Sequence, residues 1–304
     1  MEENSSQDQI ADDGREITAR MTVEELRGKP KRREAPKIRA VIKVAARTDL
    51  GRVRENNEDK FDFFDPDDPD IQARRGSLFL VADGMGGHSA GQIASELALK
   101  QILRAYYQDS EIDPAEALQA AIVDANSLVY EAARAVAERS GMGATVTAAV
   151  IWGDKLIVGQ VGDSRAYLVS KSSGDAKRIT EDHSWVAEQV RLGTLTESEA
   201  RNSPFRNVIT RAIGTSPTVV ADIFEEELRD GDTVVLCTDG LHGNITTEEI
   251  AASAASKGPS EAALELVDLA NERGGNDNIT VLIARVTEFR PRLKKTLLGR
   301  IRRR

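Results

Sequence analysis

The sequence predicts one α+β domain in which helices cover antiparallel β-sheets. Apolar runs of strand length recur along the chain, and segments with helical apolar spacing lie between them. Two tight-turn sequences interrupt the longest of these runs, which favours antiparallel pairing. A chain of 304 residues with 40% hydrophobic side chains is also long enough to bury a sizeable core. We expect this domain over residues 41–290, with helices against the sheets.

Five stretches have the composition and alternation of strands, beginning with IRAVIKVAARTD at 38–49. The third stretch contains the turn sequences Trp152-Gly153-Asp154-Lys155 and Gly162-Asp163-Ser164, so we expect a hairpin at each turn. The other stretches after the first are SLFLVAD (77–83), ATVTAAVIWGDKLIVGQVGDSRAYLVS (144–170, the third), DTVVLCTDG (232–240) and NITVLIARV (278–286).

Three long helices are predicted between these strands. Ser89 and Gln92 have capping-box spacing ahead of a helical apolar pattern. A third helix is predicted from about 260 to 273 and ends at Gly274-Gly275. Asp113-Pro114 begins the second helix, and its predicted apolar face is Leu118, Ala121, Ile122, Ala125, Leu128, Val129, Ala132 and Val136.

The ends of the chain differ in composition from the domain. Residues 1–40 are polar and contain a basic, proline-bearing stretch, so we expect a disordered tail and linker, with a short helix at 22–27 as its only candidate element. Residues 291–304 carry seven basic and no acidic side chains. A solvated basic tail is the simpler interpretation; weak contact with an anionic membrane or an acidic partner is the alternative, because its leucines and isoleucine share one helical face.

The charge distribution excludes several classes of protein. Residues 41–290 carry 25 of the 41 Lys and Arg and 41 of the 50 Asp and Glu, a net charge of −16, so nucleic acid is not an expected partner. There is no run of eighteen apolar residues and no secretory signal pattern. Cys237 is the single cysteine, which excludes an internal disulfide. We therefore expect a cytoplasmic protein, and a monomer.

The glycine-rich turn after residues 78–82 poses a choice between a nucleotide and a metal. A dinucleotide-binding turn would continue Gly84 and Gly86 with a third glycine, but position 89 is serine. The chain has no Walker sequence either. Asp83 stands at the strand end, where a carboxylate suits a metal ion that in turn binds phosphate.

Carboxylates recur at strand ends or turns in five separated strings. Where such ends converge, the acids repel one another and would take up protons unless cations neutralise them. Oxygen-only ligands favour Mg²⁺ or Mn²⁺ over zinc, and the three histidines, His88, His183 and His242, have no zinc-site spacing. The strings are RENNED (54–59), VADGMGG (81–87), VGDSRAY (161–167), CTDGL (237–241) and GGNDNIT (274–280).

These five strings, in this order, resemble those of the metal-dependent serine/threonine phosphatases of the PPM family, also called protein phosphatase 2C, and of its bacterial branch in particular. The resemblance covers about residues 44–287. It implies two antiparallel sheets packed as a sandwich with helices on both outer sides, an αββα arrangement. It also implies that the enzyme hydrolyses phosphoserine and phosphothreonine in proteins.

The resemblance further implies a centre of two Mn²⁺ or Mg²⁺ ions. Asp83, Asp239 and Asp277 would hold the first ion. Glu58, Asp83 and the carbonyl of Gly84 would hold the second, so that Asp83 bridges the two. Two such ions lower the pKa of a bridging water, which then attacks phosphorus without a covalent phosphoenzyme.

Other positions match the family pattern in different roles. Arg54 would bind the phosphate group, for which its planar fork is suited. Asp59 would act on a metal through water, and Asp163 resembles the bacterial ligand for a third, weaker metal that it shares with Asp239. Asn278 follows Asp277 as the pattern expects. No role carries over to His88, because it does not stand at the position of the animal enzymes' histidine.

The segment 184–214 joins two strands without adding one. SWVAEQVRLG predicts a helix that ends at Gly193, and TESEA (196–200) predicts the start of another. By resemblance this segment is the flap beside the active site, and His183 is a structural residue at its start. Cys237 is predicted to be a buried strand residue, since Gly243 occupies the place of the arginine that a cysteine-dependent phosphatase needs.

The sequence therefore predicts a phosphatase that acts on phosphorylated proteins, among them a bacterial Ser/Thr kinase and its substrates. The alternative is a catalytically inactive member of the same family that serves as a binding or regulatory module. All the ligand acids are present, which favours the enzyme. A different two-metal phosphohydrolase is disfavoured by the lack of a histidine-rich ligand pattern.

Overall fold

The computed structural model describes residues 33–86, 89–108 and 112–292. The predicted helix at 22–27, His88 and the basic C-terminal segment from residue 293 lie outside the described residues. The described residues belong to one unit, residues 32–304. Its first strand begins at Ile38, so the boundary predicted at residue 41 falls inside a strand.

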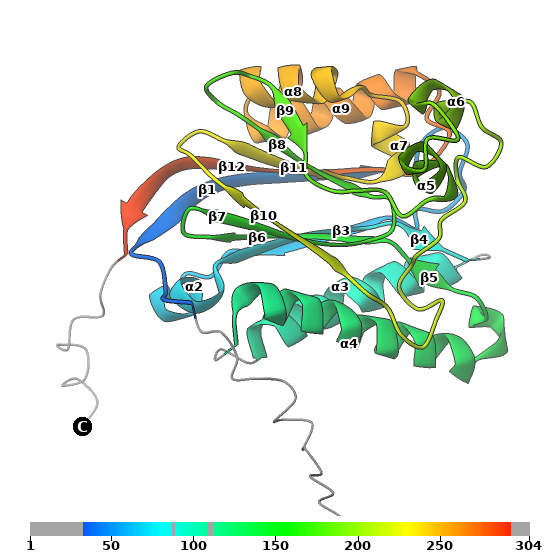
Figure 1. The fold of residues 1–304 in the computed structure, drawn as a ribbon, viewed down its shortest axis with the longest axis horizontal. Helices are drawn as coiled ribbons and strands as arrows, with labels where there is room; N and C mark the ends of the chain where they lie inside the picture. Colours follow the sequence, from blue (N-terminus) through cyan, green and yellow to red (C-terminus); the bar gives the residue numbers. More distant parts are fainter. Residues whose placement is uncertain (1–32, 87–88, 109–111, 293–304) are drawn as a thin grey trace, which may run out of the picture. The chain divides into compact units, whose positions relative to one another are not determined.

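Two five-stranded sheets, antiparallel throughout their described pairs, form the centre of the unit (Figure 1). The first sheet has the order β1 (Ile38–Asp49), β12 (Ile279–Pro291), β11 (Thr233–Cys237), β8 (Arg165–Val169) and β9 (Ala176–Arg178). The second has the order β10 (Asp222–Glu227), β7 (Lys155–Val161), β6 (Val146–Trp152), β3 (Ser77–Ala82) and β2 (Lys60–Phe64). A short ribbon pairs β4 (Gly84–Met85) with β5 (Gly143–Ala144).

Helices cover the outer face of each sheet, which confirms the predicted αββα fold (Figure 1). The first sheet is covered by α8 (Thr247–Ser256) and α9 (Pro259–Glu272), and the second by α3 (Ala90–Gln108) and α4 (Pro114–Ala135). The remaining helices are short: α2 (Pro69–Arg75), α5 (Trp185–Arg191), α6 (Glu197–Arg201), α7 (Asp239–His242) and a 3₁₀ turn, η1 (Ala137–Arg139). Among the described residues, no helix is both long and apolar enough to span a membrane.

Strands that lie between a sheet and a helix layer are buried on both faces. In β3 the side chains alternate: Leu78 and Leu80 pack toward α3 and α4, whereas Phe79 and Val81 pack between the two sheets. This explains why the strand reads as a continuous apolar run and not as an alternating one. Burying such side chains contributes about 1.5–3 kcal/mol each, which makes the sandwich a rigid support for its loops.

The predicted helix ends agree with the structure at several points. Asp113 caps α4 by accepting a hydrogen bond from the amide of Ala115 at 2.9 Å. Thr196 and Glu199 form a complete capping box at α6. The helix α5 ends at Arg191, just before Gly193, which has a φ of 73°.

Two predictions about these elements were wrong. The turn at Gly162-Asp163-Ser164 is not a hairpin, because β7 belongs to the second sheet and β8 to the first. Gly162, with a φ of 108°, lets the chain cross from one sheet to the other. The predicted apolar face of α4 was also too wide. Leu128 is exposed because the helix buries only the side that meets the second sheet, and Val136 is exposed at the C-cap, beyond the last helical residue.

Candidate metal centre

The site acids stand where strands from both sheets end or begin. Asp83 follows β3 of the second sheet, Asp239 opens α7 directly after β11 of the first, and Asp277 precedes β12. Glu58 and Asp59 lie just before β2. A fifth segment, the crossover between β7 and β8, carries Asp163. The carboxylates therefore lie at the same end of the sandwich, on five separate segments.

That crossover places Asp163 with the other acids. Burial raises the pKa of Asp83 well above its usual value, and the nearby negative charges of Asp59, Asp239, Asp163 and Asp277 raise that pKa further. Charges of like sign affect one another in this way only when they lie close together. The structure thus gathers the predicted acids around Asp83.

Burial dominates the electrostatics of the other acids as well. It raises the pKa of Asp59 to about 7 and that of Asp163 to about 8. The pKa of Asp239 rises to about 6, again through burial and then through the charge of Asp277. Glu58 also has a raised pKa, mainly because of its burial. Each of these groups costs free energy to ionise unless positive charge arrives from outside the chain.

Three of these acids each have a buried oxygen that accepts no hydrogen bond from the described residues: Oδ1 of Asp59, of Asp163 and of Asp239. Buried polar atoms are usually paired, so these oxygens suit an external partner. Carboxylate and carbonyl oxygens are the ligands that Mg²⁺ and Mn²⁺ prefer. Within the described ranges, no three or more His, Cys, Asp or Glu side chains are placed so that they could hold a metal ion. The chemistry of the donor set, and not a preformed arrangement of ligands, is what fits hard divalent cations.

Buried threonines hold two of the acids in place. Thr238 donates a hydrogen bond from Oγ1 to Oδ2 of Asp59 at 2.7 Å, and itself accepts one from the amide of Thr280 at 3.0 Å. Thr145 accepts from the amide of Asp83 at 3.0 Å. Sequence reasoning missed both supporting threonines, although Thr238 directly precedes a predicted ligand.

The Gly84 turn is packed too tightly for any side chain. A Cβ atom there would lie 2.1 Å from the carbonyl oxygen of Gly91 and 2.7 Å from that of Glu58. At Gly91, the second residue of α3, a Cβ atom would lie 2.4 Å from Oε2 of Glu58. The close approach of three segments brings the Glu58 carboxylate beside the Gly84 backbone, as the predicted second metal site requires.

Arg54 lies at the exposed edge of the acid cluster. Its Nη2 donates to Oδ2 of Asp277 at 2.7 Å, and the guanidinium is about half exposed. This hydrogen bond is the main reason that the pKa of Arg54 is raised. A guanidinium in this place can bind an anion that approaches the carboxylates from solvent.

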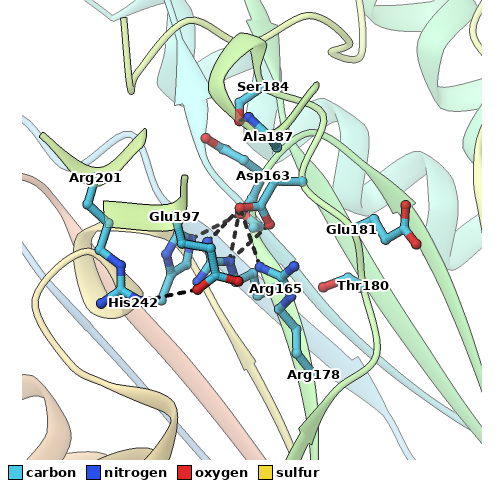
Figure 2. Close-up of polar contacts among 12 residues, drawn as sticks. Asp163, Arg165, Arg178, Thr180, Glu181, Ser184, Ala187, Glu197, Arg201 and His242 are labelled. Carbon is cyan, nitrogen blue, oxygen red and sulfur yellow. Dashed lines mark hydrogen bonds and ion pairs between the residues drawn. The ribbon is translucent and has the colours of Figure 1, made fainter. Parts of the chain in front are cut away.

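Two histidines form hydrogen bonds with the loops around Asp163, and Figure 2 shows one of them, His242. Nε2 of His242 donates to the backbone oxygen of Asp163 at 3.0 Å, and burial lowers the pKa of this histidine to about 3, so it stays neutral. His183 accepts from the amide of Gly162 at 3.0 Å and lies 2.9 Å from Oδ2 of Asp222. Both links position the crossover that carries Asp163.

Comparison with known proteins connects this geometry to a family. The family model described as protein phosphatase 2C matches residues 49–279. The chain belongs to this family. Every predicted site residue, from Arg54 to Asp277, lies inside the part of the chain that this family model matches.

Relatives and solved structures agree with the assignment to protein phosphatase 2C. The chain is similar to serine/threonine phosphatase stp of Listeria innocua, with 36% identity over 242 residues that cover 78% of this chain and 93% of the relative. It is also similar to the solved structure of the Streptococcus agalactiae serine/threonine phosphatase, with a TM-score of 0.73, 35% identity, and coverage of 81% of this chain and 100% of the other.

A third similarity bears on the metal. The structure of the catalytic domain of serine threonine protein phosphatase PstP in complex with 2 manganese ions has a TM-score of 0.70 and 34% identity to this protein phosphatase 2C, covering 81% of this chain and 99% of the other. The predicted family, fold, enzyme class and use of Mn²⁺ or Mg²⁺ are thereby confirmed.

Proposed function

We propose that the chain hydrolyses phosphoserine and phosphothreonine in proteins at a centre of two Mn²⁺ or Mg²⁺ ions. The observation that carries this proposal is the gathering of carboxylates from both sheets around Asp83; three of them have a buried oxygen that no described residue hydrogen-bonds. Arg54 at the exposed edge supplies the group that an incoming phosphate needs.

The ligands follow from the family pattern and from the positions of the side chains. Asp83, Asp239 and Asp277 hold the first ion. Glu58, Asp83 and the Gly84 carbonyl hold the second, an assignment that the tight packing of Gly84 against the Glu58 backbone supports.

Two further acids complete the proposed centre. Asp163 and Asp239 hold a third, weaker ion; both have a buried Oδ1 without a partner among the described residues. Asp59 acts through water, because Thr238 binds its Oδ2 and leaves Oδ1 open to a water hydrogen.

The chain's own residues have definable roles in hydrolysis. The acids named above would hold the two ions, whose positive charge would lower the pKa of a bound water so that hydroxide would be available near neutral pH. Arg54 exchanges its hydrogen bond with Asp277 for two oxygens of the phosphate and holds them in a fixed orientation. Asp59 orients a water through its open oxygen. Cys237 takes no part, because it is buried and its pKa is raised to about 12.

The proposed substrates are phosphorylated proteins, including a bacterial Ser/Thr kinase and the targets of that kinase. Relatives named as serine/threonine phosphatases, stp of Listeria innocua and PstP of Mycobacterium tuberculosis, support this choice. The inactive binding module is not favoured, since every acid of the ligand pattern is present. The monomeric state, the cytoplasmic setting and the place of the flap beside the active site stay predictions.

The proposal is tested by phosphate release from a phosphothreonine peptide with Mn²⁺, with EDTA and with the variant Asp239→Asn. We expect metal-dependent turnover that EDTA abolishes and that Asp239→Asn lowers at least 100-fold, on the order of the loss of one essential electrostatic group. Asp124→Asn, an exposed acid on α4, is the matched control and should keep full activity. Mn²⁺ binding by calorimetry without turnover would instead assign the chain as a binding module.

A further inference from the structure

A surface cavity of about 360 Å³ lies at the C-terminal end of α4, and we call it the α4 cavity. Its volume falls within the range of ligand sites, roughly 300–1,000 Å³. By comparison, the cavity beside Ile38 has only about 10 Å³, about the space of one water. The α4 cavity is lined by Tyr130, Ala133, Arg134, Ala137, Ser140, Gly141, Gly214 and Thr215.

The lining of the α4 cavity favours a negatively charged group. Arg134 is its only charged side chain, and no carboxylate among the described residues forms an ion pair with it. Its guanidinium lies over the Tyr130 ring, 5.5 Å from the ring centroid and within cation–π range, and its Nη1 donates to the Tyr130 hydroxyl at 3.4 Å. The hydroxyls of Tyr130, Ser140 and Thr215 add polar atoms around it.

Short contacts connect the α4 cavity to the proposed metal centre. Thr215 lies against Gly143 of β5, where a Cβ atom would be 2.8 Å from its methyl carbon. Ile213, two residues earlier, forms a β-bridge with Ala144 through hydrogen bonds of 2.8 and 3.0 Å. Ala144 in turn pairs with Gly84 of β4. Two strand spacings, roughly 10 Å, therefore separate Gly84 from Ile213, the residue next to Gly214 of the cavity wall.

That separation matches the reach of a short peptide. An extended chain advances about 3.3 Å per residue, so a side chain about three to five residues from a phosphorylated residue spans the distance. The 213–215 segment is also the end of the predicted flap, which Asn126 of α4 fixes by accepting from the Gly214 amide at 2.8 Å. The cavity wall is therefore a fixed surface next to the site.

We propose that the α4 cavity binds the carboxylate of an Asp or Glu in the phosphoprotein substrate, about three to five residues from the phosphorylated Ser or Thr. This inference rests on the proposed function. Arg134 provides the charge, and the Tyr130 and Ser140 hydroxyls donate hydrogen bonds to the carboxylate. The cavity thereby selects phosphorylation sites with an acidic neighbour.

The test compares phosphothreonine peptides that differ only by Glu or Gln at each position three to five residues from the phosphothreonine, on either side. With the full-length wild type and Mn²⁺, we expect a kcat/KM roughly two- to fivefold higher for one Glu position, the size expected for an exposed ion pair, and carried by KM. Arg134→Gln should remove the difference in kcat/KM between the Glu and Gln peptides. Arg134→Glu should instead give the highest kcat/KM with a third peptide that carries Lys at the same position.

The matched control is Arg104→Gln, an exposed arginine near the end of α3, which should keep the Glu preference. Equal activity of wild type and Arg134→Gln on every peptide pair would overturn the proposal. A second outcome would also overturn it: free glutarate changes the hydrolysis rate of the Gln peptide, and Arg134→Gln abolishes this change. The cavity would then bind a small free carboxylate and not the substrate.

The two proposals fail separately. If no phosphopeptide is turned over, the phosphatase proposal fails, and fluorescence polarisation of the same peptides bearing a non-hydrolysable phosphonate still measures the cavity. Weaker binding of the Glu peptide to Arg134→Gln, with the Gln peptide unchanged, supports the acidic subsite in that case as well. No difference between the peptides overturns it.

Discussion

Asp59 illustrates how single residues in this enzyme depend on their neighbours. The side chain is 1% exposed, its Oδ2 accepts from Thr238, and its Oδ1 has no partner among the described residues. Burial raises its pKa to about 7. Near neutral pH the carboxyl group of Asp59 can therefore lose its proton when a cation binds nearby.

The support that Thr238 provides can be measured with Thr238→Val, which keeps the shape and removes the hydroxyl. The change leaves Oδ2 of Asp59 and the amide of Thr280 without their hydrogen bonds, so we expect the free energy of unfolding to fall by about 2 kcal/mol. Urea denaturation of the metal-free protein measures this loss. Combining it with Asp59→Asn should give less than the sum of the two single effects. Strict additivity would mean that the two side chains do not interact.

At the scale of elements, the sequence predicted the strands that are rich in apolar residues and missed the strands that are not. The strand β10, DIFEEE, is a half-buried acidic edge strand, and its pairing with β7 is what makes it a strand. The turn at Gly162-Asp163 has hairpin chemistry, yet it joins two different sheets. Turn residues fix local backbone angles, whereas the partner of the next strand depends on packing across the whole sandwich.

The candidate site was more predictable than its surroundings for a physical reason. Acids next to glycine at the end of an apolar strand are visible in the sequence, and the structure brings Asp83, Asp163, Asp239 and Asp277 near one another. Their roles as metal ligands stay predictions. Their supports were not visible, since a buried threonine such as Thr145 has no special pattern. The α4 cavity was not predictable either, because its walls come from segments far apart in the chain.

The contact between the start of α3 and the Glu58 loop gives an element-scale prediction. Gly91→Ala improves helix propensity, but its methyl group would lie 2.4 Å from Oε2 of Glu58 and 2.8 Å from the carbonyl carbon of Gly84. We expect the half-saturating Mn²⁺ concentration to rise at least tenfold in activity titrations, as for other changes to groups that orient ligands. Gly258→Ala, with open space around its Cβ position, is the control. An unchanged Mn²⁺ requirement in Gly91→Ala would argue against Glu58 as a ligand.

For the whole molecule, the acid cluster links stability to pH. A carboxyl group whose pKa is higher in the folded than in the unfolded protein binds more protons when folded, so stability falls as pH rises toward the folded pKa. Asp59 and Asp163, at about 7 and 8, act this way from about pH 4, the usual pKa of an aspartate, up to about pH 8. His183 and His242 have lowered pKa values and act in the opposite direction only below about pH 6.5.

We therefore expect the metal-free protein to lose a few kcal/mol of stability between about pH 6.5 and 8. Saturating Mn²⁺ should restore about 2.7 kcal/mol at one hundred times its dissociation constant. Thermal unfolding at a series of pH values, with EDTA or with Mn²⁺, measures both effects. In Asp163→Asn the pH dependence without metal should be shallower. A stability that increases with pH over this window would contradict the account.

The proposed ligands come from both sheets, with Asp83 on the second and Asp239 and Asp277 on the first. Ions held by all three would tie the two sheets together at one end of the sandwich, where like charges otherwise push them apart. Scarcity of manganese would then do more than stop catalysis. It would let that end of the sandwich open more often, expose the chain to proteases and reduce the amount of enzyme present, so that the supply of an ion would govern abundance as well as turnover.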